Sequence, residues 1–228
     1  MSKWLRSALI FCAVCATICS PTYAGTLVLF DEDAATEAGK GKFAALFTSH
    51  DAGSTVTVTT KDAYTGKSSV FATPSQSYNN NMTDWKFAIK EKPGANEYRY
   101  ISLAWKSVGG KGVMIQFPDS GNWGAVTTPC VGPPAPGTRR YIAGENVTGW
   151  SGVCVSKEVP AKWTLVQRDL FTDFGAFTIT GMALTPFSDG GDGDYYDAIM
   201  ISSEDLSKLT AVEPTGKATL TWGALKVR

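Results

Sequence analysis

Two tryptophans lie in short segments rich in glycine, asparagine and serine, which are typical of exposed loops. Trp123 follows Gly-Asn, and Trp150 follows Thr-Gly. An indole in such a loop can stack on the apolar face of a pyranose ring, while neighbouring amides bind its hydroxyl groups. The same tryptophans could instead cover the core beneath their loops, and the sequence favours neither role. The neighbours that could complete a sugar site are Tyr141, Gln116, Asn122 and Arg140, of which the arginine could read an acidic sugar.

Catalytic chemistry has few candidate residues in this chain. The single histidine, His50, precedes Asp51, and no Gly-x-Ser-x-Gly segment supplies a nucleophile for a Ser-His-Asp relay. A catalytic zinc ion needs several histidine or cysteine ligands, which one histidine does not provide. A carboxylate pair for glycoside hydrolysis leaves no mark in linear spacing. We therefore expect a protein that is not an enzyme, with a polysaccharide-active enzyme as the less favoured alternative.

One acidic residue lies where a carboxylate needs a partner. Asp197 stands among apolar neighbours in Tyr-Tyr-Asp-Ala-Ile, and burial of an unpaired carboxylate is costly. It could form a salt bridge, for which Arg168 is a candidate, or it could bind a metal ion. Both explanations remain open from the sequence.

The amino terminus has the features of a signal peptide. Lys3 and Arg6 precede an apolar run from Ala8 to Cys19, and small residues follow up to Ala24. The apolar run is shorter than the ~20 residues needed to span a bilayer. We expect residues 1–24 to be cleaved, which predicts a secreted or periplasmic (cell-envelope) protein without a stable membrane span.

The cysteines point to a single disulfide bond. Three of the five lie within residues 1–24, which leaves Cys130 and Cys154 in the exported chain. Two thiols in an oxidising compartment most simply form one disulfide. Cys130 lies in a proline-rich stretch, residues 118–139, and loops of this length in a compact domain are usually functional or fixed by a cross-link.

Charge excludes two classes of partner. Without Lys3 and Arg6, 19 basic residues of the original 21 face 21 acidic residues, and no basic stripe is present. Nucleic acid and anionic membranes are therefore poor partners.

Apolar alternation predicts strands throughout the mature chain. About ten short runs are separated by Gly, Pro, Asn and Asp turns, which predicts an all-β antiparallel sandwich. We expect a β-sandwich domain over residues 25–203 and a tail over residues 204–228, in which Lys217 to Trp222 could add an edge strand. The residues predicted to face the core are Val56, Val58, Val113, Ile115, Ile179 and Ile199.

Several of these runs resemble the galactose-binding-like β-sandwich superfamily, which includes many carbohydrate-binding modules. The matching segments are Tyr98 to Trp105, Gly112 to Phe117, Trp163-Thr-Leu-Val, Tyr195 to Ile199, and a first strand that ends in Phe30-Asp31-Glu32. The resemblance implies a jelly roll that binds a glycan or polysaccharide. It also implies a structural calcium ion that joins Asp31 or Glu32 to Asp197. The long loop with its cysteine departs from a minimal module.

These observations predict an exported, non-catalytic, single-domain jelly roll that binds carbohydrate through loop aromatics. A structural or protein-interaction module of the cell envelope, with the same fold and no sugar site, is the competing hypothesis; its partner would be an envelope protein.

Overall fold

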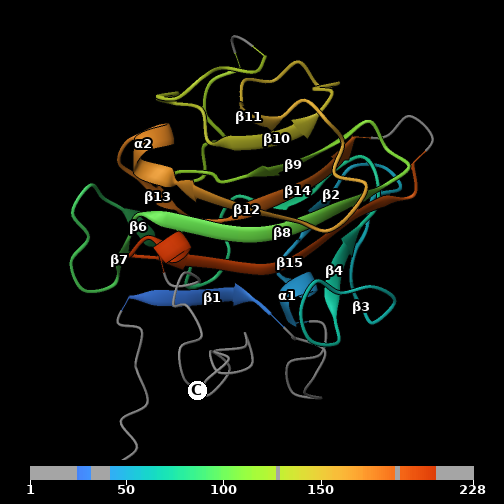
Figure 1. Cartoon of the computed structure of the whole chain (residues 1–228), viewed down its shortest axis with the longest axis horizontal. Coiled ribbons are helices and arrows are strands. Elements are labelled where there is room, and N and C mark those ends of the chain that lie inside the picture. Colours follow the sequence, from blue (N-terminus) through green and yellow to red (C-terminus); the bar gives the residue numbers. More distant parts are fainter. Residues whose placement is uncertain (1–24, 32–41, 127–128, 188–190, 209–228) are drawn as a thin grey trace, which may run out of the picture.

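The apolar runs form two stacked β-sheets, called here sheet A and sheet B (Figure 1). The computed structural model describes residues 25–31, 42–126, 129–187 and 191–208. Sheet A has the order β12 (Thr164–Asp169), β8 (Tyr100–Val108), β15 (Gly193–Ser202), β4 (Ser69–Ala72) and β3 (Val56–Thr59), and β1 (Thr26–Phe30) also pairs with β15. Sheet B has the order β11 (Val153–Ser156), β10 (Arg140–Gly144), β9 (Gly112–Gln116), β14 (Met182–Phe187), β5 (Ser77–Asn79) and β2 (Ser49–His50).

The prediction of an antiparallel jelly-roll β-sandwich is confirmed. Strands that are distant in the sequence lie next to each other, as β15 does between β8 and β4, and β14 between β9 and β5. All pairs within sheets A and B are antiparallel except β10 with β11. More strands are present than the sequence suggested, because short edge segments also pair.

A small third sheet and two short helices complete the described part of the chain. The sheet contains β13 (Phe177–Ile179), β6 (Phe87–Ile89) and β7 (Glu97–Tyr98). The helices are α1 (Lys42–Ala45) and α2 (Leu170–Phe174), and a 3-10 turn, η2 (Leu206–Lys208), follows β15. The side chain of Asp169 caps α2 by accepting a hydrogen bond from the Thr172 N–H at 3.0 Å.

Four of the six predicted core residues are fully buried between the sheets: Val113, Ile115, Ile179 and Ile199. The other two, Val56 and Val58, were also expected to be buried, but the structure leaves them only half-buried. Both belong to β3, which forms the edge of sheet A and therefore has a strand on one side only. The alternation was read correctly, but it does not reveal that β3 is an edge strand.

The predicted disulfide between Cys130 and Cys154 is confirmed, with a Cα–Cα distance of 5.0 Å. It fastens the long proline-rich loop to β11. Next to it, the Val131 N–H donates to the carbonyl of Gly152 at 2.9 Å. The loop is therefore attached to the edge of sheet B by a covalent bond and a backbone hydrogen bond.

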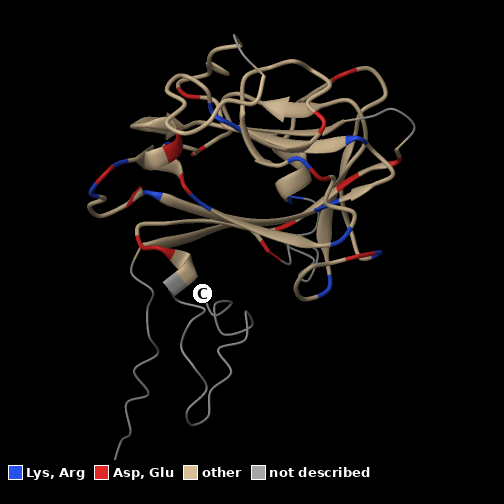
Figure 2. Cartoon of the chain, turned by 45° about the horizontal axis from the view of Figure 1, so that its top comes forward, with Lys and Arg blue, Asp and Glu red and all other residues tan. Residues whose placement is uncertain are grey.

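Acidic and basic residues are interspersed over the described surface (Figure 2). Within the described ranges, no helix is both long and apolar enough to cross a membrane. The predicted signal peptide, Glu32, and the proposed edge strand from Lys217 to Trp222 lie outside the described residues, so those expectations stay predictions.

Candidate functional site

A row of outward-facing side chains crosses sheet B in register. Tyr78 on β5 is paired with Ala183 on β14, which is paired with Gln116 on β9, which is paired with Arg140 on β10. Residues one step along the strands point the other way, into the core, as Ile115 and Tyr141 do. The outer face of sheet B therefore carries polar and aromatic groups on strands that are held by the core. Ala183, Gln116 and Arg140 are buried beneath the loops on this face, and Tyr78 is half-buried.

Hydrogen bonds join the polar members of this face into a strip. The Arg140 Nε donates to the Gln116 Oε1 at 2.6 Å. The Gln116 Nε2 donates to the Gln76 Oε1 at 2.5 Å and to the Thr185 Oγ1 at 3.1 Å, and the Thr185 hydroxyl donates to the same Gln76 oxygen at 3.0 Å. These bonds fix the two amides in one orientation. Gln76 is half-buried and brings the strip to the surface.

The two loop tryptophans lie at opposite ends of this in-register row. Trp123 meets the ring of Tyr78 edge-on, with ring centroids 5.9 Å apart. Trp150 lies against Arg140, whose Cζ is 5.5 Å from the indole centroid. Both tryptophans are half-buried. The contact with Tyr78 places Trp123 beside the β5 end of the row, and the contact with Arg140 places Trp150 beside the β10 end.

Trp150 also has a packing role. It covers a small apolar cluster on the outer face of sheet B that contains Met114, Ile142 and Phe187. The side chain of Asn146 donates to the Trp150 carbonyl at 2.6 Å and holds this loop in place. The two roles considered for this tryptophan are thus combined, because one face of it covers apolar side chains while part of it stays accessible.

Arg140 connects both loops to the sheet. Its Nη1 donates to the carbonyl of Ala125 at 2.8 Å and to the carbonyl of Ser151 at 3.2 Å. Burial lowers the pKa of Arg140 to about 10, with repulsion from Arg139 as a second cause; the guanidinium is still charged at neutral pH. Among the described residues no carboxylate forms an ion pair with Arg140, and the groups that balance its charge there are carbonyl and amide oxygens.

Two of the predicted site residues lie away from this strip. Tyr141 is fully buried on the core side of β10, where its hydroxyl donates to Asp173 Oδ2 at 2.7 Å. Asn122 is exposed, and its side-chain oxygen accepts from the Gly124 N–H at 2.7 Å to shape the Trp123 loop. The structure thus brings Trp123, Trp150, Gln116 and Arg140 to one face, whereas Tyr141 points to the opposite one.

Three residues of this face were missed by the sequence analysis, namely Gln76, Tyr78 and Thr185. They come from segments far from the tryptophans in the sequence, and the register of β5 and β14 brings them together. Alternation could have placed them on an outward face, but no sequence signal shows which strands are neighbours.

The two predicted metal residues that the structure describes, Asp31 and Asp197, accept hydrogen bonds from protein groups. Both oxygens of the buried Asp197 accept backbone hydrogen bonds, Oδ2 from Tyr64 (2.8 Å) and Thr65 (3.0 Å) and Oδ1 from Ala198 (2.7 Å). Asp31 Oδ1 accepts from the Thr65 hydroxyl at 3.0 Å. Burial raises the pKa of Asp197 to about 6 despite these donors.

The donors around Asp197 do not suit a calcium ion. Three N–H groups occupy the carboxylate, whereas calcium needs several free oxygen ligands. Within the described ranges, no group of three or more His, Cys, Asp and Glu side chains could hold a metal ion. Calcium therefore stays a hypothesis that would require ligands beyond these two aspartates.

The alternative salt bridge between Arg168 and Asp197 is wrong. Arg168 instead binds Asp173 through two hydrogen bonds, of 2.7 Å from Nε and 2.6 Å from Nη2. Asp173 also accepts the Tyr141 hydroxyl, so one carboxylate joins α2, β10 and β12. Nothing in the sequence favoured Asp173 over Asp197 as the partner of Arg168, since the short helix α2 that carries Asp173 was not predicted.

His50 forms one contact that a serine hydrolase would also use. Its Nδ1 lies 2.8 Å from the hydroxyl of Ser77, which in turn lies 2.8 Å from the hydroxyl of Ser54. Ser77 is fully buried, so a substrate carbonyl has no access to its oxygen. The contact holds β2 against β5 and does not assemble a nucleophile.

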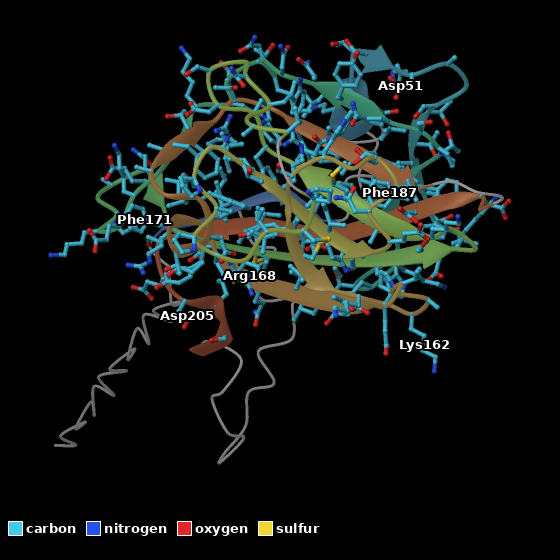
Figure 3. The ribbon with its side chains drawn as sticks, turned by 90° about the horizontal axis from the view of Figure 1, so that it is seen from above. Asp51, Lys162, Arg168, Phe171, Phe187 and Asp205 are labelled. Atoms are coloured by element: carbon cyan, nitrogen blue, oxygen red, sulfur yellow. A yellow bond between two sulfur atoms is a disulfide. The ribbon has the colours of Figure 1, made fainter. Side chains whose placement is uncertain are left out.

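A pocket of about 560 Å³ opens between β11 and β12, away from the tryptophan loops. Its floor contains the core residues Trp105 and Val166, and its rim contains Lys162 and Arg168, which lie apart along one edge of the molecule (Figure 3). Arg168 is committed to Asp173. This pocket is the gap between the two edge strands of the sandwich.

Comparisons with known proteins give similarity in structure only. No protein-family profile matches the sequence, and no curated protein matches it. Similar solved structures include the glycoside hydrolase domain of Endo-D from Streptococcus pneumoniae R6, at 14% identity and a TM-score of 0.40. That match covers 69% of this chain but only 21% of the hydrolase, so the chain spans about a fifth of its length.

Two further structures are carbohydrate-binding modules. A family 11 module from Clostridium thermocellum, in complex with a β-1,3-1,4-mixed-linked tetrasaccharide, is 12% identical, with a TM-score of 0.36 over 66% of this chain and 84% of the module. A xylan-binding domain of family 22 from Paenibacillus barcinonensis is 18% identical, with a TM-score of 0.29 over 68% of this chain and 83% of the domain. The fold assignment rests on the strand order described above.

Proposed function

We propose that this protein is an exported, non-catalytic module that binds carbohydrate on the outer face of sheet B. The observation that carries the proposal is the arrangement of two half-buried indoles, Trp123 and Trp150, at the two ends of an in-register row backed by a fixed strip of amide and hydroxyl groups. Aromatic rings supply apolar contact area for sugar rings, and a few oriented polar groups give specificity for hydroxyls.

The strip is prepared for binding before a ligand arrives. The buried Gln116 and Arg140 are held by hydrogen bonds, and Gln116 in turn orients the amide of the half-buried Gln76 at the surface. A prearranged site loses little conformational entropy on binding. Ala183 separates Tyr78 from Gln116 in the row and is fully buried.

Titration calorimetry on the mature protein tests the proposal. The probes are oligosaccharides of xylan and of mixed-linkage β-glucan, the glycans named for two of the similar structures, together with a uronic acid oligosaccharide. Trp123→Ala is expected to weaken binding by about tenfold or more, because it removes one stacking ring. Val126→Ala is the matched control, since Val126 is exposed in the same loop.

Three outcomes are informative. Loss of binding in Trp123→Ala with an unchanged melting temperature supports the sugar site. A large fall in stability with unchanged affinity shows that Trp123 only covers the sheet. If no glycan binds and an envelope protein co-purifies with the wild type, the module is a structural or protein-interaction domain.

A further inference from the structure

A second row of in-register side chains crosses the outer face of sheet A. Phe71 on β4 is paired with Tyr195 on β15, which is paired with Lys106 on β8. The pairing of Thr164 with Trp105 continues this register, so Trp163 lies next to Lys106 on the β12 side. The adjacent residues Val70, Ala72, Tyr196 and Trp105 are buried in the core, which shows that this row faces outward.

The aromatic members of the row touch one another. The ring centroids of Phe71 and Tyr195 are 4.6 Å apart, and those of Tyr195 and Trp163 are 6.1 Å apart. Tyr64, from the loop between β3 and β4, extends the series at 5.9 Å from Trp163. All four rings are half-buried. With neighbouring strands ~4.8 Å apart, the four strands span roughly 14 Å.

One carboxylate fixes the far end of the row. The Trp163 Nε1 donates to Asp62 Oδ1 at 2.8 Å, and the Lys106 Nζ donates to Asp62 Oδ2 at 2.5 Å. The same ammonium group lies 5.9 Å from the centroid of Tyr195. These hydrogen bonds lower the pKa of Asp62, so the aspartate and the lysine carry opposite charges that cancel. The row is rigid and has no net charge.

A glycine makes room for the first ring. Gly193 precedes Tyr195 by two residues on β15 and therefore faces outward as well. A Cβ atom at Gly193 would lie 2.8 Å from the Cζ of Phe71 and 2.2 Å from the carbonyl oxygen of Ala72. Its φ of +142° is also a backbone conformation that residues with a side chain rarely adopt. The missing side chain at Gly193 thus leaves room for the tip of the Phe71 ring beside Tyr195.

We propose that Phe71, Tyr195, Trp163 and Tyr64, called here the sheet A row, form a second carbohydrate-binding surface that takes a neutral polysaccharide chain. Successive rings are inclined by 47°, 51° and 51°, so each offers its face in a different direction, as suits a twisted chain. Lys106 and Asp62 stand beside the rings as hydrogen-bonding groups for hydroxyls.

The composition of the row favours a sugar over a protein partner. The large apolar side chains that are exposed among the described residues are Val28, Val126 and Val147, and none of them adjoins these rings. Aromatic rings flanked by a self-neutralised ion pair match alternating C–H faces and hydroxyls. This surface is on the opposite sheet from Trp123 and Trp150, so the inference does not rest on the proposed site of sheet B.

The experiment measures the number of glycan sites by titration calorimetry with xylan and mixed-linkage β-glucan oligosaccharides. Trp163→Ala and, as a second variant at the loop end of the row, Tyr64→Ala are compared with Val28→Ala, an exposed residue on the same face of the same sheet. Circular dichroism confirms that each variant is folded. We expect two sites in the wild type, one in Trp163→Ala, and about tenfold weaker binding at that site in Tyr64→Ala.

The outcomes separate the two surfaces. If Trp123→Ala abolishes all binding and the two sheet A variants change nothing, the sheet A row is not a binding surface and the site on sheet B stands. If the sheet A variants abolish binding and Trp123→Ala does not, the sheet A row stands and the proposed function of sheet B fails. Absence of binding to every neutral glycan overturns the sheet A row as well.

Discussion

The guanidinium of Arg140 lies against the indole of Trp150, with its Cζ 5.5 Å from the ring centroid. The same guanidinium binds the carbonyls of Ala125 and Ser151, which belong to the two loops that carry Trp123 and Trp150. One buried cation therefore positions both tryptophans. The conformation of these two loops, and with it the exposure of the two indole rings, therefore depends on Arg140.

This relationship predicts that the two tryptophans respond differently to truncation. Trp150→Ala should lower the free energy of unfolding by roughly 2–3 kcal/mol, because it uncovers Met114, Ile142 and Phe187. Trp123→Ala should cost less, because its ring contact is with the half-buried Tyr78. Urea unfolding measures both, with Val147→Ala as the control in the Trp150 loop. Equal losses for the two tryptophans would contradict this account.

The salt dependence of binding reports whether Arg140 contacts the ligand. Arg140 is buried, and carbonyl and amide oxygens balance its charge without a carboxylate partner among the described residues. An acidic sugar bound beside it would therefore be attracted by a cation that no anion neutralises. Binding of a uronic acid oligosaccharide should weaken as salt rises, whereas binding of a neutral oligosaccharide should be nearly unaffected. Calorimetry at low and high ionic strength distinguishes them, and equal salt responses would show that Arg140 serves only the loops.

Reduction of the disulfide should loosen the proline-rich loop. The bond between Cys130 and Cys154 closes a separation of 24 residues, which stabilises the fold by about 3 kcal/mol in the chain-entropy model. The double variant Cys130→Ser, Cys154→Ser should lose a comparable amount in urea unfolding. Free thiols found in untreated protein by mass spectrometry would show that the bond does not form in solution.

Much of the fold follows from residue types and short-range spacing. Alternation around Val113 and Ile115 correctly predicted a buried strand, and the cysteine count correctly paired Cys130 with Cys154. The first inference succeeds because the alternation of a strand is a property of neighbouring residues. The second succeeds because two cysteines in an oxidising compartment have only one possible pairing.

The candidate sites depend on strand order, which the sequence does not contain. Gln76 reaches Gln116 only because β5 and β9 both lie beside β14. Trp163 begins a strand-like segment in the sequence, but it precedes β12 and is half-buried beside Tyr195 on the outer face of sheet A. Non-local pairing decides which outward residues meet, and a single sequence carries no direct signal for it.

We expect Asp197 to stabilise the fold through its hydrogen bonds and not through a bound metal ion. Its carboxylate accepts three backbone hydrogen bonds from Tyr64, Thr65 and Ala198. Asp197→Ala should cost several kcal/mol, because it leaves those N–H groups without their acceptor, whereas the exposed Asp51→Ala should cost little. A chelator should leave the melting temperature of the wild type unchanged. A melting temperature that rises with added calcium would instead support the calcium hypothesis from the sequence.

Asp194 should make the protein less stable as pH rises. It is only 1% exposed, and no hydrogen bond of good geometry reaches its carboxyl oxygens from the described residues, although the nearby Ser107 hydroxyl partly offsets the effect of burial on its pKa. Burial raises its pKa well above the usual range, and Asp197, with a pKa of about 6, acts in the same direction.

The sign follows from proton binding. Both carboxyls bind a proton more tightly in the folded state than in the unfolded chain, where an aspartate has a pKa of about 3.9. Their stabilising effect is complete below that value and is lost as pH rises through the folded pKa values. The free energy of unfolding should therefore fall between about pH 4 and about pH 7.

Asp194→Asn isolates the contribution of that residue. The amide has nearly the same shape but does not titrate, so the variant should gain stability relative to the wild type at neutral pH and show a weaker pH dependence. Asp192→Asn is the matched control, because Asp192 is exposed two residues earlier in the chain. Urea unfolding across this pH range measures the difference. If wild type and Asp194→Asn have parallel pH profiles, Asp194 has a partner in solution that keeps it ionised.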